Sequence, residues 1–216
     1  MKRAVDWSLY LVTDRELAGG RPLPWLVDAA VRGGVTAVQV REKRCTTREF
    51  LRLAREVKEV LAGRGVPLLI NDRVDVALAA GADGVHLGQS DLPVADARRL
   101  LGDDALIGLS VETAEQADEA EASGADYLGV SPVFRTPTKI DTLAEWGLDG
   151  LRALRARSKR VLVAIGGINE SNAADVIRAG ADGLAVVSAI CAAPDPREAA
   201  RRLRAMTEDV RRVPYR

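Results

Sequence analysis

The phrase Gly81-Ala82-Asp83-Gly84 recurs along the chain in closely related forms, each directly before a short apolar run. The other copies are Gly33-Gly34-Val35-Thr36, Gly124-Ala125-Asp126-Tyr127 and Gly180-Ala181-Asp182-Gly183. The first glycine of each phrase suits the left-handed turn that ends a helix, and the short turn then leads into a strand. We therefore expect these glycines to be caps between elements, without a chemical role.

Eight short runs rich in Val, Ile and Leu alternate with helical segments from one end of the chain to the other. They predict strands at Leu9–Val12, Ala37–Val40, Pro67–Ile70, Gly84–Leu87, Leu106–Leu109, Tyr127–Val130, Val161–Ile165 and Gly183–Val187. The runs are apolar on both faces, which is typical of parallel strands covered by helices. Between them, apolar residues recur with helical spacing, most clearly over 47–62, 113–123 and 195–206.

This alternation predicts an α/β fold, a single (β/α)₈ TIM barrel that covers residues 1–216. The repeated phrases precede every second strand, so the repeat spans two βα units, as in a barrel whose interior layers alternate between odd and even strands. An open doubly wound sheet of similar length is the alternative. The one long connection, at about 131–147, is expected to be an active-site lid.

Charge and composition exclude several kinds of function. The 31 Lys and Arg residues balance the 31 Asp and Glu residues, so no net field attracts nucleic acid or a membrane surface. The single histidine, His86, excludes a site with several histidine ligands. Cys45 and Cys191 are far apart and predict reduced thiols in a cytoplasmic protein. No stretch resembles a signal peptide or a membrane span. The sequence leaves the oligomeric state open, with a homo-oligomer among the alternatives.

Polar residues stand at the carboxyl ends of the predicted strands, where barrels carry their chemistry. Alternation along the strand puts Gln39, Arg41 and Lys43 on one face, inside the mouth of the barrel. Other strand ends contribute Asn71, Asp72, His86, Asp91, Ser110, Gly166, Gly167 and Ser188. Structural roles compete at several of these positions, because short polar residues often cap helices and a lone histidine is most often a hydrogen-bonded core residue.

Taken together, these residues predict two anion sites in one mouth. Gly166 and Gly167 before a helix start, together with Ser188, form the phosphate site that barrels often build after their last two strands. Arg41 lies with Lys43 on the opposite side, near two carboxylates of the kind that hold Mg²⁺ against phosphate oxygens. We therefore expect a monophosphate at one edge and a metal-bound polyphosphate at the other.

At these residues the sequence resembles the thiamine phosphate synthase family over nearly the whole chain. Six segments carry the resemblance: QVREK (39–43), ND (71–72), GVHLGQSD (84–91), PVFRTPTK (132–139), GGI (166–168) and VS (187–188). The family implies a (β/α)₈ barrel that acts as a transferase on small molecules. It joins hydroxymethylpyrimidine diphosphate to a carboxylated thiazole phosphate and gives thiamine phosphate, diphosphate and carbon dioxide with Mg²⁺.

The resemblance also implies roles for single positions. Ser110, Lys139 and Arg41 would be catalytic, and Asp72 and Asp91 would hold Mg²⁺. The diphosphate would be held by Arg41, Lys43, Asn71 and Lys139, with a hydrogen bond from Ser110 near the bond that breaks. Gln39 would contact the aminopyrimidine. The thiazole phosphate would be bound by Thr136, Thr138, Gly167, Val187 and Ser188.

The implied reaction is a dissociative substitution, in which diphosphate leaves and the electron-rich pyrimidine stabilises the remaining cation. Such a step needs no protein nucleophile, which agrees with the expectation that the mouth holds no Cys–His or Ser–His pair. Two departures from the family stand out: Ser131 replaces a glycine of many relatives, and Glu112 replaces a histidine of several. The alternatives are a thiazole phosphate tautomerase, which Glu112 argues against, and a non-catalytic barrel that binds a phosphorylated ligand.

Overall fold

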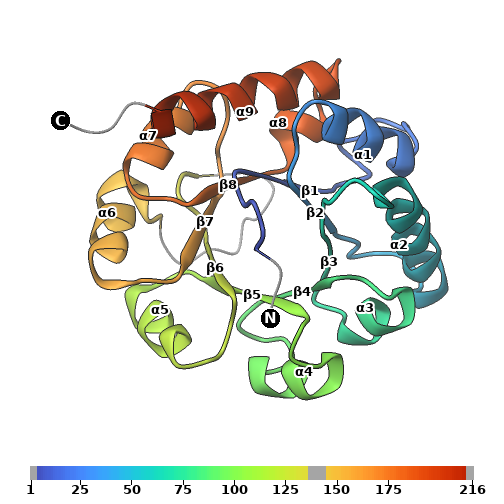
Figure 1. Cartoon of the computed structure of the whole chain (residues 1–216), viewed down its shortest axis with the longest axis horizontal. Coiled ribbons are helices and arrows are strands. Elements are labelled where there is room, and N and C mark those ends of the chain that lie inside the picture. Colours follow the sequence, from blue (N-terminus) through green and yellow to red (C-terminus); the bar gives the residue numbers. More distant parts are fainter. Residues whose placement is uncertain (1–3, 136–144, 213–216) are drawn as a thin grey trace.

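The computed structural model describes residues 4–135 and 145–212. Within them, eight strands close in sequence order into a parallel barrel surrounded by helices (Figure 1). The last strand, β8 (Gly183–Val186), pairs in parallel with the first, β1 (Leu9–Val12). The predicted barrel is therefore confirmed, and the alternative of an open doubly wound sheet is wrong.

The other strands begin and end within two residues of the predicted runs. They are β2 (Ala37–Val40), β3 (Leu68–Asn71), β4 (Gly84–Leu87), β5 (Leu106–Val111), β6 (Tyr127–Val130) and β7 (Val161–Ile165). The described helices are α1 (Leu23–Arg32), α2 (Thr47–Leu61), α3 (Val74–Ala80), α4 (Val94–Leu101), α5 (Ala114–Glu121), α6 (Gly147–Arg157), α7 (Ala173–Arg178), α8 (Ser188–Cys191) and α9 (Pro196–Arg212). In this part of the chain, no helix combines the length and apolarity needed to cross a membrane.

The repeated phrases are the turns that feed the even-numbered strands. Their acidic residues, Asp83, Asp126 and Asp182, each accept a hydrogen bond of 2.8 Å from the backbone N–H of the first or second residue of the preceding strand. The leading glycine has a positive φ in three of the four phrases. Gly33 is the exception, because it stays helical with φ −82° while Gly34 takes the left-handed turn at φ 108°.

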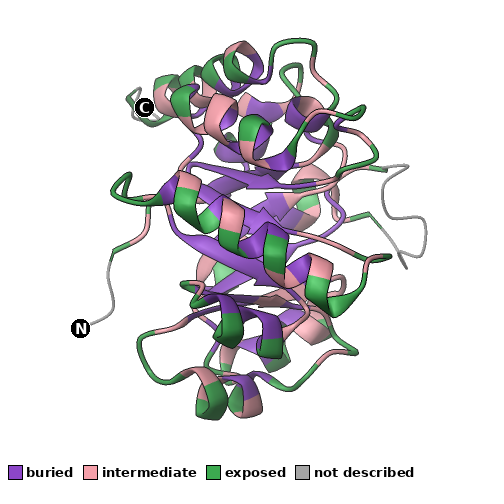
Figure 2. Cartoon of the chain, turned by 90° about the vertical axis from the view of Figure 1, so that its right-hand side faces the viewer, coloured by how far each residue is buried: buried purple, intermediate pink, exposed green. Residues whose placement is uncertain are grey.

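The barrel has two hydrophobic cores, one outside the sheet and one inside it. The outer core lies between the strands and the helices, whose outward faces are exposed (Figure 2). The inner core holds the rings of Trp7, Tyr10 and Tyr127, with 4.2 Å between the Trp7 and Tyr127 centroids. Trp7 precedes β1, so these rings fill the barrel from its amino-terminal end, and the space that remains opens at the carboxyl ends of the strands.

The predicted lid lies mostly outside the described residues, which include its two ends. The ends are joined by backbone hydrogen bonds of 2.9 Å from Trp146 to Pro132 and from Gly147 to Val133. Thr136, Thr138 and Lys139, for which the family resemblance implies roles in substrate binding, also lie outside the described residues.

Candidate active site

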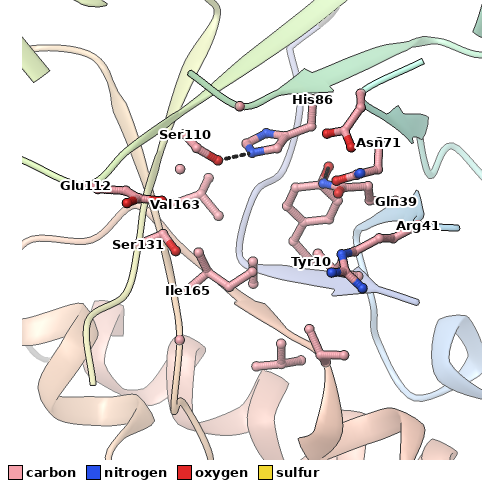
Figure 3. Close-up of a pocket in the computed structure, with 18 of the residues that line it drawn as sticks. Tyr10, Gln39, Arg41, Asn71, His86, Ser110, Glu112, Ser131, Val163 and Ile165 are labelled. Carbon is pink, nitrogen blue, oxygen red and sulfur yellow. Dashed lines mark hydrogen bonds between the residues drawn. The ribbon is translucent and has the colours of Figure 1, made fainter. Parts of the chain in front are cut away.

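A cavity of about 800 Å³ opens at the carboxyl ends of the strands. It brings together all the predicted site residues that the structure describes, namely Gln39, Arg41, Lys43, Asn71, Asp72, Asp91, Ser110, Gly167, Val187 and Ser188. Gln39, Arg41 and Asn71 gather on one side, and Ser110, Glu112 and Ser131 lie on the other, with Tyr10 between them (Figure 3). Residues that are distant in sequence thus share one mouth, as parallel strand ends in a barrel require.

The β2 side of the cavity carries its cations. The backbone N–H of Arg41 donates to Thr13 Oγ1 at 3.1 Å, and its guanidinium lies 3.8 Å from Asp14. Lys43 Nζ lies 2.5 Å from Asp72 Oδ2 and is half exposed. These contacts hold two positive groups at one edge of the mouth, where they can receive an anionic ligand.

Asn71 supplies an unmet donor on the same side. It is the last residue of β3 and is 7% exposed. Among the described residues, its Nδ2 is the one buried side-chain nitrogen or oxygen that lacks a hydrogen-bond partner. A buried amide left unpaired is costly, so this position is suited to a ligand that brings an acceptor oxygen.

Asp72 has an unusual backbone conformation. Its φ of 61° is the one positive value at a described residue other than glycine. Its N–H donates to the carbonyl of His86 at 2.8 Å, which ties the end of β3 to β4. Backbone strain of this kind persists where neighbouring structure enforces it and is concentrated at functional sites.

Asp91 lies close enough to Asp72 for the two carboxyl groups to interact. Burial raises the pKa of Asp91, and the hydrogen bond and like charge of Asp72 raise it further, against the opposing effects of the Gly88 N–H and Lys43. The Gly88 N–H donates to Asp91 Oδ2 at 2.7 Å. The competing interpretation of these aspartates as helix caps is wrong, because α3 begins after Arg73 and α4 after Pro93, with no side-chain cap.

The two carboxylates fit a magnesium ion. In the described part of the chain, no three His, Cys, Asp or Glu side chains cluster as a complete metal site. Mg²⁺ does not need one, because it commonly takes one or two carboxylates and completes its shell with water and phosphate oxygens. A cation between Asp72 and Asp91 would also relieve the repulsion by Asp72 that adds to the effect of burial in raising the Asp91 pKa.

The opposite edge is built from glycine backbone. Gly166 and Gly167 have φ values of 104° and 66°. A Cβ on Gly167 would lie 2.8 Å from Phe134 Cβ, so only glycine fits between this turn and the segment after β6. The carbonyl oxygen of Gly167 accepts a hydrogen bond from Asn172 Nδ2 at 3.0 Å. This oxygen would repel a phosphate, and the hydrogen bond directs it toward Asn172. Ser188 lies beside this turn in the lining of the same cavity.

Tyr10, Tyr127 and His86 also line the cavity, although none of them was assigned a role in binding or catalysis from the sequence. The expectation of no Ser–His pair in the mouth is wrong, because His86, expected to be a structural residue, contacts Ser110 with Nε2···Oγ at 2.9 Å. Alternation along β1 and β6 would have placed both tyrosines inside the barrel. Nothing in the sequence pairs them with one another across it.

Comparison with known proteins identifies the family. The family model for thiamine monophosphate synthase matches residues 9–190. A thiamine-phosphate synthase of Albidiferax ferrireducens is 60% identical over 202 residues, which cover 94% of this chain and 92% of the relative. The enzyme of the same name from Chloroflexus aurantiacus is 56% identical, with 94% and 93% covered.

The chain belongs to the thiamine monophosphate synthase family.

Solved structures agree with this membership of the thiamine monophosphate synthase family. The thiamine phosphate pyrophosphorylase of Pyrococcus furiosus superposes with a TM-score of 0.87 at 41% identity, covering 95% of this chain and 97% of the other. A 3-hexulose-6-phosphate synthase superposes at 0.70 with 21% identity, a likeness of fold alone. The family's barrel therefore extends over nearly all of this chain.

Proposed function

We propose that this chain is a transferase that joins hydroxymethylpyrimidine diphosphate to a thiazole phosphate, forms thiamine phosphate and releases diphosphate. When the thiazole is carboxylated, carbon dioxide is released as well. One observation carries the proposal: the cavity places paired carboxylates, cations and an unmet amide donor at one edge, and a glycine turn with a serine at the other. That arrangement suits two substrates that each bring an anionic group.

On the diphosphate side, Arg41 and Lys43 supply positive charge and Asn71 Nδ2 supplies a hydrogen bond to a phosphate oxygen. Asp72 and Asp91 would hold Mg²⁺, which neutralises the charge that grows on the departing diphosphate. Lys139, outside the described residues, is proposed to add a further cation there. Charge-stabilising groups of this kind lower the barrier because they favour the transition state over the bound substrate.

Gln39 and Ser110 are proposed to act on either side of the bond that breaks. Gln39 binds the aminopyrimidine, and Ser110 donates its hydroxyl hydrogen to the diphosphate oxygen that leaves. The pyrimidine stabilises the resulting cation until the thiazole nitrogen attacks it, so no protein nucleophile takes part. Exclusion of water during this interval protects the cation from capture.

On the thiazole side, Gly167, Val187 and Ser188 are proposed to bind the monophosphate. Thr136 and Thr138, which lie outside the described residues, are proposed to contact the thiazole ring. Because this edge lies across the mouth from Arg41, the ring would face the pyrimidine carbon that it attacks. A cytoplasmic location is part of the proposal and is supported by two free cysteines, Cys45 and Cys191.

A reaction with both substrates and Mg²⁺ tests the proposal. Purified protein should release diphosphate only when both substrates are present, and removal of Mg²⁺ with a chelator should stop the release. Asp91→Asn should lose this activity, whereas the matched variant Asp96→Asn, on the exposed face of α4 beside Arg99, should keep it. Isomerised thiazole without diphosphate would favour the tautomerase, and tight binding without turnover would favour a non-catalytic barrel.

A further inference from the structure

We propose that five side chains form one polarised hydrogen-bond chain across the barrel, in the order Gln39, Tyr10, Tyr127, His86 and Ser110. Through this chain, the amide of Gln39 determines which nitrogen of His86 carries the proton and which way the Ser110 hydroxyl points. The inference rests on the proposed function only for the ligands at its two ends, the aminopyrimidine at Gln39 and the diphosphate at Ser110. The hydrogen-bond chain itself is present in the folded protein without substrate.

Four consecutive contacts define the chain. Gln39 Nε2 donates to Tyr10 Oη at 2.8 Å, and Tyr10 Oη lies 3.0 Å from Tyr127 Oη. Tyr127 Oη lies 2.8 Å from His86 Nδ1, and His86 Nε2 lies 2.9 Å from Ser110 Oγ. The residues come from β2, β1, β6, β4 and β5, so the chain links strands that do not all adjoin around the barrel.

Glycines on two neighbouring strands leave the space that Tyr127 and His86 occupy in the middle of the hydrogen-bond chain. A Cβ on Gly108 would lie within 2.5 Å of both Tyr127 Oη and His86 Nδ1. A Cβ on Gly129 would lie 2.8 Å from His86 Cε1. These positions on β5 and β6 therefore accept only glycine while the ring and the phenol keep their places.

The two tyrosines in the middle of the hydrogen-bond chain are buried and keep their protons. Tyr10 is 1% exposed and Tyr127 is not exposed at all. Burial raises the pKa of both phenols well above the ordinary value of 10.0. Each hydroxyl therefore stays neutral and has a single hydrogen to donate, and a neutral imidazole likewise has a single N–H.

One hydrogen per contact gives the chain a single direction. Because Gln39 Nε2 donates to Tyr10 Oη, the Tyr10 oxygen is the acceptor in that contact and its own hydrogen goes to Tyr127 Oη. Tyr127 in turn donates its hydrogen to His86 Nδ1. The imidazole then carries its hydrogen on Nε2 and donates to Ser110 Oγ. The Ser110 hydrogen is thereby left for a ligand oxygen in the cavity that Ser110 lines.

The opposite direction would change what the site can do. If Gln39 presented an acceptor to Tyr10, each donor would reverse, and Ser110 would donate to His86 Nε2. Ser110 would then offer only an acceptor to the diphosphate, an oxygen that repels an anion. His86, Tyr127 and Tyr10 are therefore positioning residues, which make the group at the far end a hydrogen-bond donor.

His86 is the only histidine in the protein sequence, so ¹⁵N-histidine labelling of the untagged protein reports on this residue alone. We expect ¹⁵N NMR at pH 8, without substrate, to show a protonated Nε2 and an unprotonated Nδ1. In Gln39→Glu the carboxylate can only accept, so the chain should reverse and the proton should move to Nδ1. In Tyr10→Phe the chain is cut, and a mixture of the two tautomers should replace the single one.

Gln89→Glu is the matched control, because Gln89 lines the same cavity and donates to the Ser110 carbonyl at 2.6 Å without belonging to the chain. It introduces the same charge and should leave the His86 tautomer as it is. A change in Gln39→Glu or Tyr10→Phe that Gln89→Glu lacks supports the proposal. A protonated Nδ1 in the unmodified protein would overturn it, as would one tautomer shared by all the variants, or an equal change in Gln89→Glu. None of these results depends on catalysis.

Discussion

The left-handed conformation of Asp72 leads to a prediction that separates backbone strain from lost charge. Asp72→Gly and Asp72→Ala both delete the carboxylate, and they differ only in how the new residue tolerates a φ of 61°. Asp72→Asn keeps the size of the side chain and its tolerance of this conformation but removes the charge. The three variants together show what the position contributes to folding and what it contributes to activity.

The expected difference in stability follows from the backbone. An alanine held at this φ costs roughly 1–2 kcal/mol. Glycine avoids that cost but loses about 0.5–1 kcal/mol through the greater freedom of its unfolded chain. Asp72→Gly should therefore be more stable than Asp72→Ala by about 0.5–1 kcal/mol, or about 1–4 °C in melting temperature for a chain of this size.

Activity should fall in all three variants, by about 100-fold or more, because each removes a proposed metal ligand. Thermal melts without Mg²⁺ would measure the strain, and diphosphate release would measure the activity. Asp75→Asn is the control, since Asp75 lies on α3 beside Arg73 and faces solvent. Equal melting temperatures for the glycine and alanine variants would refute the strain, and full activity of Asp72→Asn would refute the metal role.

Three further outcomes follow from the site. The raised pKa of Asp91 means that its ionisation opposes folding. Asp91→Asn should therefore raise the melting temperature at pH 7. It should give no gain at pH 3, where the Asp91 carboxyl of the unmodified protein is protonated in both the folded and the unfolded state. Protonation of the same carboxyl should weaken Mg²⁺ binding as the pH falls, which calorimetry between pH 8 and pH 4 would measure; constant affinity would contradict the assignment. Gly167→Ala should raise KM for the thiazole phosphate about tenfold or more by displacing one phosphate contact, while KM for the pyrimidine diphosphate stays within about twofold.

The barrel could be predicted from the sequence because its strands carry a strong local signal. Runs such as Val161–Ile165 are apolar on both faces, and the structure gives β7 the same limits. Ends that depend on tertiary packing were harder to place. The last helix, predicted over 195–206, continues to Arg212, because the segment keeps a buried position at Thr207 and an ion pair between Arg204 and Glu208.

The position of the site was also predictable, since parallel strands bring their carboxyl ends to one mouth. The conformation of its residues was not. The motif around Asp72 reads equally well as a helix cap, and only the fold shows that the residue is left-handed and close to Asp91. Alternation places Tyr10 and Tyr127 inside the barrel, but the contact between them depends on the stagger of strands that are distant in sequence.

A crystal structure of the protein with thiamine phosphate, diphosphate and Mg²⁺ would test the proposed two-anion site most directly. The metal should lie between Asp72 and Asp91, about 2.0–2.1 Å from the oxygens that coordinate it directly, with the diphosphate toward Arg41 and Lys43. The phosphate of the product should lie at Gly167 and Ser188 across the mouth. A metal held away from both aspartates, or a diphosphate at the glycine turn, would contradict the assignment of the two edges.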